Sequence, residues 1–458
     1  MAEDNTTQCW LFPSLLRKPL VVRFDDERGS SDGGALLLKA ADERIGLTTA
    51  LSGGLRDDRE PGRVSHELQE LVQQRVFAIA CGYPDGNDAA RLAEDPIHKL
   101  LIGREPIDGE ALASQPTLSR FENSVGRADL YRLSEALAQT VIERHRKRLR
   151  GRAHLITIDL DQTADLAHGE QQLALFNGYY GNTCYLPLLG FLTFEDEVEQ
   201  YLFTAVLRSG TARDKDGAIA VLKRLFDLVK PAFPKARLRV RTDAGFASPE
   251  VFAFLEAEKV EYVIAMPKNA VLERRAEPLM RRARRRAAES NQTEHLYGET
   301  SYAAGSWPHR RRVIIKGEVT CHPGREPKDN PRFVVTHLSQ TPIYIYEKLY
   351  CARGDVENRI KELHLGLEID RTSCHRFLAN QFRVLLTAAA FVLMQELRLR
   401  AARTPLARAQ VWTLRDRLLK IGTHVVVSVR RYVLRLPATY PFLDAWGRLA
   451  TSLGATAG

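Results

Sequence analysis

The order of apolar runs between residues 151 and 270 constrains the fold more than any other feature of the chain. The runs predict three strands, a helix, a strand, a second helix and a fifth strand. The expected strands cover residues 154–160, 185–194, 201–207, 237–243 and 261–266, and the helices cover residues 216–229 and a segment opened by Ser248-Pro249. This order predicts an α/β protein with a mixed sheet of the ribonuclease-H-like kind.

The flanking segments differ in character and indicate five regions. The first is a mostly helical N-terminal region with an extended start, and the β-rich segment after the fifth strand indicates an insertion into the core. The regions are 1–150 (helical, with helices at 64–80 and 130–149), 151–270 (first part of the core), 271–345 (insertion, with strands at 295–302, 311–319 and 332–338), 346–400 (a helical return to the core) and 401–458 (C-terminal region).

Charge and cysteine usage narrow the class of protein. Lys and Arg number 66 against 57 Asp and Glu, and the net charge of +9 favours a polyanionic partner. The six cysteines are far apart without a CxxC pair, which predicts reduced thiols and no structural zinc. The N-terminus has no signal pattern, and the longest apolar stretch, residues 384–394, is too short to span a bilayer. We therefore expect a cytoplasmic protein without a membrane partner.

A short segment in the N-terminal region has the features of a DNA-reading helix. Ser114 or Gln115 can cap a helix, and Pro116 suits its first turn. Thr117 and Arg120 then lie near the N-terminus of that helix, where a helix-turn-helix motif presents side chains to the major groove. A capped surface helix explains the same residues equally well, so the N-terminal region is a candidate DNA-binding region on this evidence.

An arginine-dense helix is expected at the start of the 271–345 segment. Its residues Arg281, Arg282 and Arg285 are candidates for contacts with DNA phosphates. A solvated helix face is the alternative, because exposed arginine-rich helices are common.

Three acidic residues stand where strands or helices would bring them together. Asp161 ends the first strand, with Asp159 two residues before it, and Asp243 ends the fourth strand just before Gly245. The first and fourth strands are neighbours in a ribonuclease-H-like sheet, and the helix of residues 346–400 can add Glu357. Three converging carboxylates suit two divalent cations, which can catalyse phosphoryl transfer.

The helix around Glu357 carries a second signal. Tyr350, Arg353, Glu357, Lys361 and His364 lie at offsets that place them within a stripe about 80° wide on an ideal helix. An acid flanked by an aromatic ring, two cations and a histidine suits a site that grips DNA phosphates beside metal ions. The alternative is a solvated charged face.

Several stretches, in this order along the chain, resemble bacterial insertion-sequence transposases of the DDE type, in the group called the insertion-sequence thirteen-eighty family. The resemblance covers about residues 20 to 445. The matching stretches are Cys81-Gly-Tyr-Pro-Asp-Gly-Asn-Asp88, Pro116-Thr-Leu-Ser-Arg-Phe-Glu-Asn123, Ile158-Asp-Leu-Asp-Gln-Thr163, Gly169-Glu-Gln-Gln-Leu-Ala-Leu-Phe-Asn-Gly-Tyr-Tyr180, Arg241-Thr-Asp-Ala-Gly-Phe246 and Tyr350-Cys-Ala-Arg-Gly-Asp-Val-Glu-Asn-Arg-Ile-Lys-Glu-Leu-His364.

The resemblance implies an enzyme that cuts and joins DNA. It implies that Asp161, Asp243 and Glu357 hold Mg²⁺ or Mn²⁺, as two ions, and that Tyr350 and Arg353 contact DNA beside them. The reaction would nick the terminal inverted repeats of the element and join the 3′ hydroxyl to target DNA. A homodimer in the DNA complex and a bacterial, nucleoid-associated location in the cytoplasm are expected.

One position departs from the family pattern. Related transposases have a lysine seven residues after the glutamate, where this chain has His364. Lys361, one turn earlier, is the candidate for the phosphate contact that this lysine would make.

Strand alternation cannot separate Asp159 from Asp161, because both side chains point to the same face of the sheet. Asp161 is nearer the carboxyl end of the strand, which favours it as the metal ligand.

Two other functions fit parts of the sequence. A metal-dependent nuclease on the same fold would hydrolyse DNA without strand transfer, and a catalytically silent DNA-binding repressor would use only the basic regions. The complete set of three acids argues against the repressor. The large N-terminal and insertion regions argue for recognition of specific DNA ends.

Overall fold

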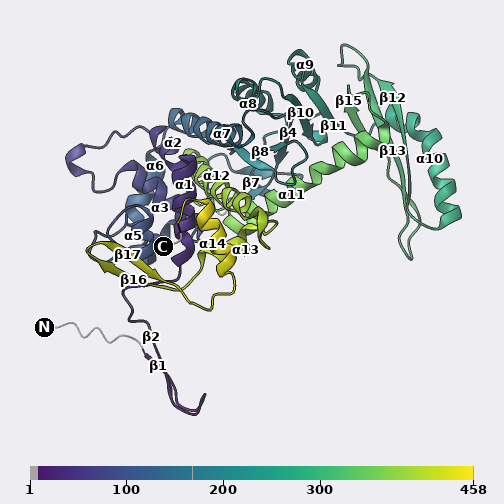
Figure 1. Ribbon diagram of the computed structural model, residues 1–458. Coiled ribbons are helices and arrows are strands. Elements are labelled where there is room, and N and C mark those ends of the chain that lie inside the picture. Colours follow the sequence, from purple (N-terminus) through teal and green to yellow (C-terminus); the bar gives the residue numbers. More distant parts are fainter. Residues whose placement is uncertain (1–8, 168, 457–458) are drawn as a thin grey trace.

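The computed structural model describes residues 9–167 and 169–456. Its centre is a nine-stranded mixed sheet in the order β12-β13-β15-β11-β10-β4-β8-β9, with β14 (Lys328–Asp329) paired to β13 (Figure 1). The central strands are β4 (Leu155–Gln162), β8 (Leu188–Phe194), β9 (Tyr201–Val206), β10 (Arg237–Thr242) and β11 (Glu261–Met266). β10 is parallel to both β4 and β11, whereas β4–β8 and β8–β9 are antiparallel. The expected mixed α/β sheet is confirmed.

Two crossover helices connect the parallel strands. They are α8 (Ala218–Ala232), between β9 and β10, and α9 (Pro249–Ala257), between β10 and β11. The Ser248 hydroxyl accepts a hydrogen bond from the Val251 amide at 3.3 Å, so the expected cap of α9 is present. β8 is buried along its whole length, which requires cover on both faces of the sheet.

The sequence predicts one strand over residues 185–194, but the structure divides this run. Residues up to Tyr185 belong to β7 (Asn182–Tyr185), and β8 begins after Pro187. Proline cannot donate a backbone hydrogen bond to a sheet, which favours a break at this position. β7 forms a separate small sheet with β5 (Asp165–Leu166) and β6 (Leu175–Asn177).

The strands expected after residue 290 are present and extend the central sheet. They are β12 (Glu294–Tyr302), β13 (Arg311–Thr320) and β15 (Arg332–Thr336), and β15 pairs antiparallel with β11. The arginine-dense helix is α10 (Ala270–Ser290), which packs on β12 and β13 (Figure 1). Its buried residues repeat every three or four positions, so one face is apolar and the arginines lie on the others.

Four helices of the N-terminal region pack against one long helix from the second half of the chain, α12 (Phe377–Arg400). They are α1 (Leu36–Ile45), α3 (Leu68–Ala80), α6 (Gln115–Ser124) and α7 (Arg127–Leu149). The same region also contains α2 (Leu47–Gly53), which packs on α3 and α7, α5 (Pro96–Leu101), which packs on α1 and α3, and the short α4 (Ala89–Leu92). The nearly buried carboxylate of Glu122 on α6 pairs with Arg75 on α3 at 2.9 Å and with Arg383 on α12 at 2.7 Å. The N-terminal helices and α12 therefore share one core.

Residues 377–403 form a helix long and apolar enough to cross a membrane, the one such helix among the residues that the structure describes. In its most apolar window, 83% of the residues are buried inside the fold. It is packed as a core helix, which explains its apolar composition.

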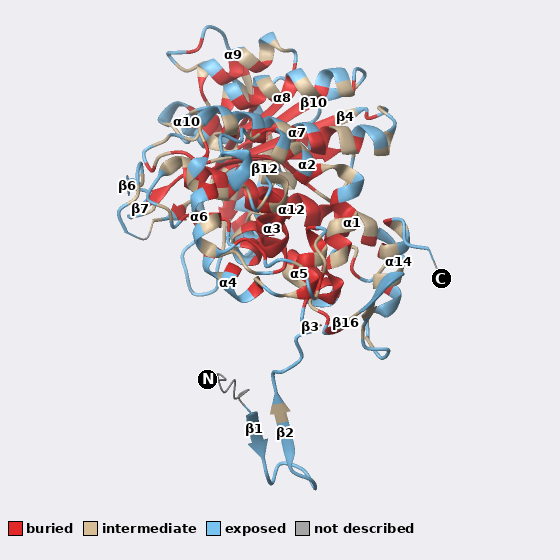
Figure 2. Cartoon of the chain, turned by 90° about the vertical axis from the view of Figure 1, so that its left-hand side faces the viewer, coloured by how far each residue is buried: buried red, intermediate tan, exposed pale blue. Residues whose placement is uncertain are grey.

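Two hairpins lie at one end of the molecule (Figure 2). The first consists of β1 (Cys9–Phe12) and β2 (Leu20–Arg23) and extends away from the body. The second, β16 (Thr423–Ser428) and β17 (Arg431–Arg435), joins β3 (Gly29–Ser30) in a three-stranded sheet. The C-terminal region also contains α13 (Val411–Leu414) and α14 (Leu443–Ser452).

Candidate active site

Asp161 and Asp243 lie at the same edge of the central sheet. Asp161 is the penultimate residue of strand β4, and Asp243 directly follows β10. The two strands are parallel neighbours in a register that pairs Asp159 with Arg241, so their carboxyl ends coincide. The neighbouring strand positions that the sequence predicted for these two acids are therefore present in the fold.

The Arg353 side chain links the two carboxylates. Its Nη2 atom lies 2.8 Å from Oδ2 of Asp161 and 4.0 Å from Oδ2 of Asp243. The guanidinium is largely buried, and its Nε atom has no hydrogen-bond partner among the described residues. A single cation within reach of both acids shows that their oxygens face one common space.

Burial raises the pKa of Asp161 to about 6, although Arg353 opposes that shift. The negative charges of Asp243 and Glu357 raise it further, so Glu357 is within electrostatic reach of Asp161. Asp161 accepts one hydrogen bond from the Gln162 amide at 2.9 Å, and Asp243 accepts one from the Gly245 amide at 3.0 Å. Lone pairs remain on both carboxylates, and such oxygen donors fit a hard divalent cation.

Asp159 has a different environment from Asp161. It is fully buried, and its two oxygens accept hydrogen bonds from Nε and Nη2 of Arg241 at 2.8 and 2.7 Å. Arg241 also donates to the Leu349 carbonyl at 3.0 Å, which ties the sheet to the segment that leads to Arg353. Asp159 is therefore engaged in a bidentate ion pair inside the protein.

Asp159→Asn is expected to destabilise the fold by about 3 kcal/mol, because Arg241 would keep its buried charge without a compensating carboxylate. The measurement is the free energy of unfolding from urea titration. Asp329→Asn is the matched control, since Asp329 pairs with Arg284 at 2.6 Å on the surface, where such a pair contributes less than about 1 kcal/mol. Equal small losses for both variants would contradict the role of the Asp159–Arg241 pair.

The segment that carries Glu357 is less regular than an ideal helix. It consists of π-helical turns at Tyr344–Tyr350, a 3₁₀ turn at Cys351–Arg353, α11 (Gly354–Lys361) and further π-helical turns at Glu362–Gly366. The stripe expected from a uniform 100° per residue therefore applies only within α11. Residues 367–376 then separate this segment from α12, so the helical stretch of residues 346–400 is interrupted.

Residues of the expected stripe lie in different surroundings. Glu357 and Lys361 are exposed on α11, and Lys361 has no ion pair within the described ranges. His364 hydrogen-bonds through Nε2 to the Thr163 hydroxyl at 2.9 Å, and its Nδ1 lies 3.3 Å from Asp370. Thr163 is two residues beyond Asp161, so His364 connects the helical segment of residues 344–366 to the end of β4.

A cavity of about 690 Å³ adjoins Asp243. Its wall includes five aromatic rings and two cations beside Asp243. These residues are Tyr179, Tyr180, Phe333, Tyr346, Tyr350, Lys268 and Arg332. Tyr350, one of the candidate DNA-binding residues, thus shares a cavity with one of the candidate metal ligands.

Asp214 is the second acid that lines this cavity, beside Asp243, and it is not among the acids predicted from the sequence. Burial raises the pKa of its half-buried carboxyl, and the nearby charge of Asp243 raises it further. A Cβ atom on Gly245 would lie 1.4 Å from an Asp214 oxygen, so only glycine leaves room for this side chain. Asp214 lies in the loop between β9 and α8, where no periodic pattern could have marked it.

The candidate DNA-binding residues outside this site are on the surface. Thr117 is half-buried and accepts a hydrogen bond from the exposed Arg120 at 3.2 Å. Residues 102–114 separate α5 from α6, which is longer than the three- or four-residue turn of a helix-turn-helix motif. Arg281, Arg282 and Arg285 are exposed on α10, and Arg285 lies 3.8 Å from Glu289.

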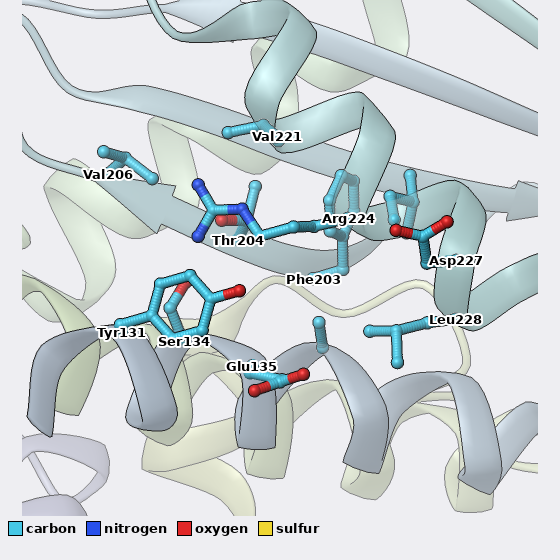
Figure 3. A pocket seen from close by; sticks show the side chains of 12 residues that line it. Tyr131, Ser134, Glu135, Phe203, Thr204, Val206, Val221, Arg224, Asp227 and Leu228 are labelled. Carbon is cyan, nitrogen blue, oxygen red and sulfur yellow. The ribbon is translucent and has the colours of Figure 1, made fainter. Parts of the chain in front are cut away.

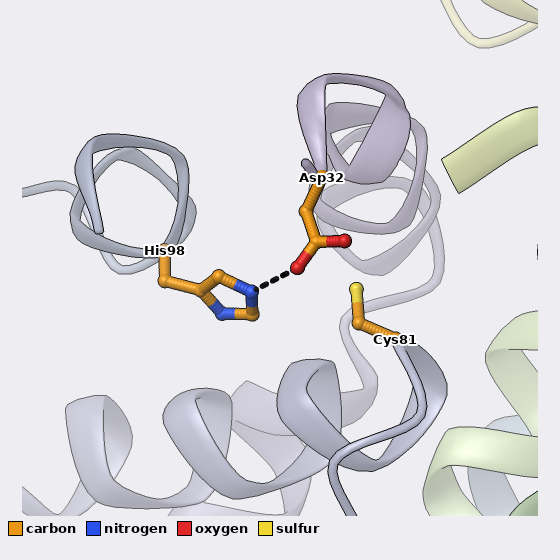
Figure 4. A group of neighbouring side chains, drawn as sticks. All are labelled: Asp32, Cys81 and His98. Carbon is orange, nitrogen blue, oxygen red and sulfur yellow. Dashed lines mark hydrogen bonds and ion pairs between the residues drawn. The ribbon is translucent and has the colours of Figure 1, made fainter. Parts of the chain in front are cut away.

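A second group of potential metal ligands is buried among the N-terminal helices (Figure 4). Ligand atoms of Asp32, Cys81 and His98 lie within 4.8 Å of one another. His98 Nε2 is 2.9 Å from one Asp32 oxygen, and the Lys420 ammonium is 2.7 Å from the other. Because His98 and Lys420 each pair with one oxygen of Asp32, we interpret the cluster as a buried polar contact that connects the N- and C-terminal regions.

Another hollow, of about 120 Å³, lies between α7, α8 and β9 (Figure 3). The Arg224 guanidinium stands 4.9 Å from the centre of the Tyr131 ring, and Asp227 and Glu135 also line it. None of the candidate site residues lines this hollow.

Comparisons with known proteins identify the family. The family model described as "Transposase DDE domain group 1" matches residues 12–457. No protein with a curated description matches the chain. Among solved structures, the chain is similar to a piggyBac transposase synaptic complex with hairpin DNA, with 9% sequence identity and a TM-score of 0.44 over 94% of this chain and 84% of that chain.

The family match spans nearly the whole chain, including both strand-end acids and the segment that carries Glu357. The resemblance to DDE transposases seen in the sequence motifs is thereby confirmed, and the chain belongs to the transposase DDE domain group 1 family.

Proposed function

We propose that this protein binds the terminal inverted repeats of an insertion sequence and catalyses metal-dependent strand cleavage and strand transfer into target DNA. The observation that carries the proposal is the convergence of Asp161 and Asp243 on one space at the carboxyl edge of parallel strands, with Glu357 within electrostatic reach. The family match supports the same class of enzyme. Residues 151–270 and 346–400 would form a ribonuclease-H-like core around the insertion of residues 271–345.

Each residue of the site has a role in this proposal. Asp161, Asp243 and Glu357 would hold two Mg²⁺ or Mn²⁺ ions, which supply Lewis-acid stabilisation of the phosphate and of the leaving oxygen. Arg353, already between the two Asp carboxylates, would neutralise a DNA phosphate at the same place. Tyr350 in the cavity wall would contact the DNA strand beside this phosphate. Asp159 would hold Arg241 in position and so keep the carboxyl ends of β4 and β10 aligned.

DNA contacts outside the site would come from the exposed cations. Lys361 extends the site along α11, and His364 would orient Thr163 at the end of β4. Thr117 and Arg120 on α6 and the arginines of α10 would bind terminal DNA. A homodimer in the DNA complex and a cytoplasmic, nucleoid-associated location complete the proposal.

One experiment separates this function from its alternatives. The purified protein is incubated with a labelled terminal-repeat duplex, a target plasmid and Mg²⁺. Joined products are expected, because the site is proposed to support both cleavage and strand transfer. Cleaved products alone would indicate a nuclease, and a shifted band without cleavage would indicate a silent DNA-binding protein.

The arginine face of α10 gives a quantitative test of DNA binding. Replacing Arg281, Arg282 and Arg285 by Ala is expected to lower the slope of log K against log salt by about 0.9 for each lost phosphate contact. The measurement is the salt dependence of binding to the terminal-repeat duplex. The control is Arg284→Ala, because Arg284 is already paired with Glu277 and Asp329. An unchanged slope in the triple variant would refute the contact.

A further inference from the structure

The N-terminal hairpin is an unusually apolar projection. We call residues 9–24 the arm; it comprises β1, β2 and the loop between them, and Figure 2 shows it extending from the body. Eight of its large apolar side chains are between 36% and 80% exposed. They are Trp10, Leu11, Phe12, Leu15, Leu16, Leu20, Val21 and Phe24. Soluble proteins rarely leave such a contiguous apolar surface without a partner.

Both faces of the arm are apolar. The register places Leu11 opposite Val21 on one face and Phe12 opposite Leu20 on the other. An isolated two-stranded hairpin is marginal in water, and none of these side chains joins a core of the described residues. DNA-contacting ribbons present polar and basic faces to the duplex, so a protein surface suits the arm better.

Charge is distributed unevenly along the arm and its connection to the body. The loop at the tip contains Arg17 and Lys18, whereas the root contains Asp25, Asp26 and Glu27. Asp26 lies 3.0 Å from His424. Over the described ranges, Arg17, Lys18, Asp25 and Glu27 form no ion pair, and all four are exposed.

We propose that a second copy of this chain covers the arm, and that the two arms pack in antiparallel fashion about a twofold axis. In that arrangement the basic tip of each arm lies against the acidic root of the other, which is the self-complementarity that a twofold interface requires. The exposed apolar side chains offer several hundred Å² from each copy, the order of area that a standard interface of about 800 Å² per partner needs. The dimer forms without DNA, so it is independent of the proposed catalytic function.

Sedimentation of the full chain without DNA tests the proposal. The wild-type protein is expected to be a dimer at micromolar concentration. Phe12→Ser combined with Leu20→Ser is expected to weaken dimerisation about 100-fold or more, since both copies lose their apolar contacts. The melting temperature, compared at a concentration at which both proteins are monomeric, should be unchanged, because the arm lies outside the core. A monomeric wild type at 50 µM (roughly the range where weak interfaces still associate), or a dimer unaffected by these changes, would overturn the proposal.

Charge reversal tests the antiparallel arrangement itself. Arg17→Glu with Lys18→Glu, or Asp25→Arg with Glu27→Arg, places like charges opposite each other and is expected to weaken the dimer at least about tenfold. All four changes in one chain restore opposite charges and should recover it. Arg430→Glu with Arg431→Glu on the β16–β17 hairpin is the matched control and should leave the dimer intact. Failure of the fourfold variant to recover would exclude the antiparallel packing.

Discussion

Asp161→Asn is expected to abolish DNA cleavage in both Mg²⁺ and Mn²⁺, by about a thousandfold or more, while the protein stays folded and binds DNA ends. Its carboxylate lies at the carboxyl end of β4, where Oδ2 is 2.8 Å from Nη2 of Arg353. Lone pairs on this carboxylate remain available for a metal ion. The amide removes one negative charge from the donor set, and several kcal/mol of transition-state stabilisation depend on correctly held ions. DNA affinity comes mainly from Lys and Arg contacts and should survive.

The comparison with Asp159→Asn makes this test specific. Asp159 is bound to Arg241 by two hydrogen bonds, so its loss should disturb the site indirectly and leave partial activity. That activity should be higher in Mn²⁺, because Mg²⁺ demands more ideal octahedral geometry. Both variants are assayed for cleavage at a temperature where circular dichroism shows them folded and a mobility shift shows them bound to DNA ends. The reverse ranking would move the ligand role to Asp159.

Much of the sheet was predictable from the sequence. The buried strands β8 and β11 are mostly apolar runs, β4 is rich in β-branched and apolar residues, and Ser248-Pro249 is a strong helix start. The neighbouring positions of Asp161 and Asp243 followed from the predicted strand order, because parallel strands end at one edge. Local patterns thus determined where these two acids lie.

Other features depend on contacts between distant segments. The irregular helical turns around Glu357 accommodate the bond from Arg241 to the Leu349 carbonyl and the bond from His364 to Thr163, neither of which periodicity can reveal. The pairing of β15 with β11 joins the strands after residue 290 to the central sheet, although their sequence resembles a separate β-rich unit. Asp214 is beside Asp243 only because Gly245 leaves space for it.

Glu357→Gln is expected to lower cleavage and strand transfer by orders of magnitude while end-binding is retained or slightly strengthened. Glu357 is exposed on α11, so the change keeps the shape of the helix and removes only the charge. Loss of that charge also removes one influence that raises the pKa of Asp161, so Asp161 should titrate lower in the variant. DNA phosphates then meet one fewer negative charge, which favours binding.

The measurement for Glu357→Gln is strand transfer and end-binding on the same labelled terminal-repeat duplex, in Mg²⁺. Glu273→Gln is the matched control, since Glu273 is an exposed acid in the first turn of α10 and lies outside the site. The control should cleave and join DNA like the wild type, because losing one surface charge leaves the donor set complete. Strand transfer near the wild-type rate in Glu357→Gln would show that the helix contributes no metal ligand, and the third carboxylate would then have to be sought at Asp214, which already shares the cavity with Asp243.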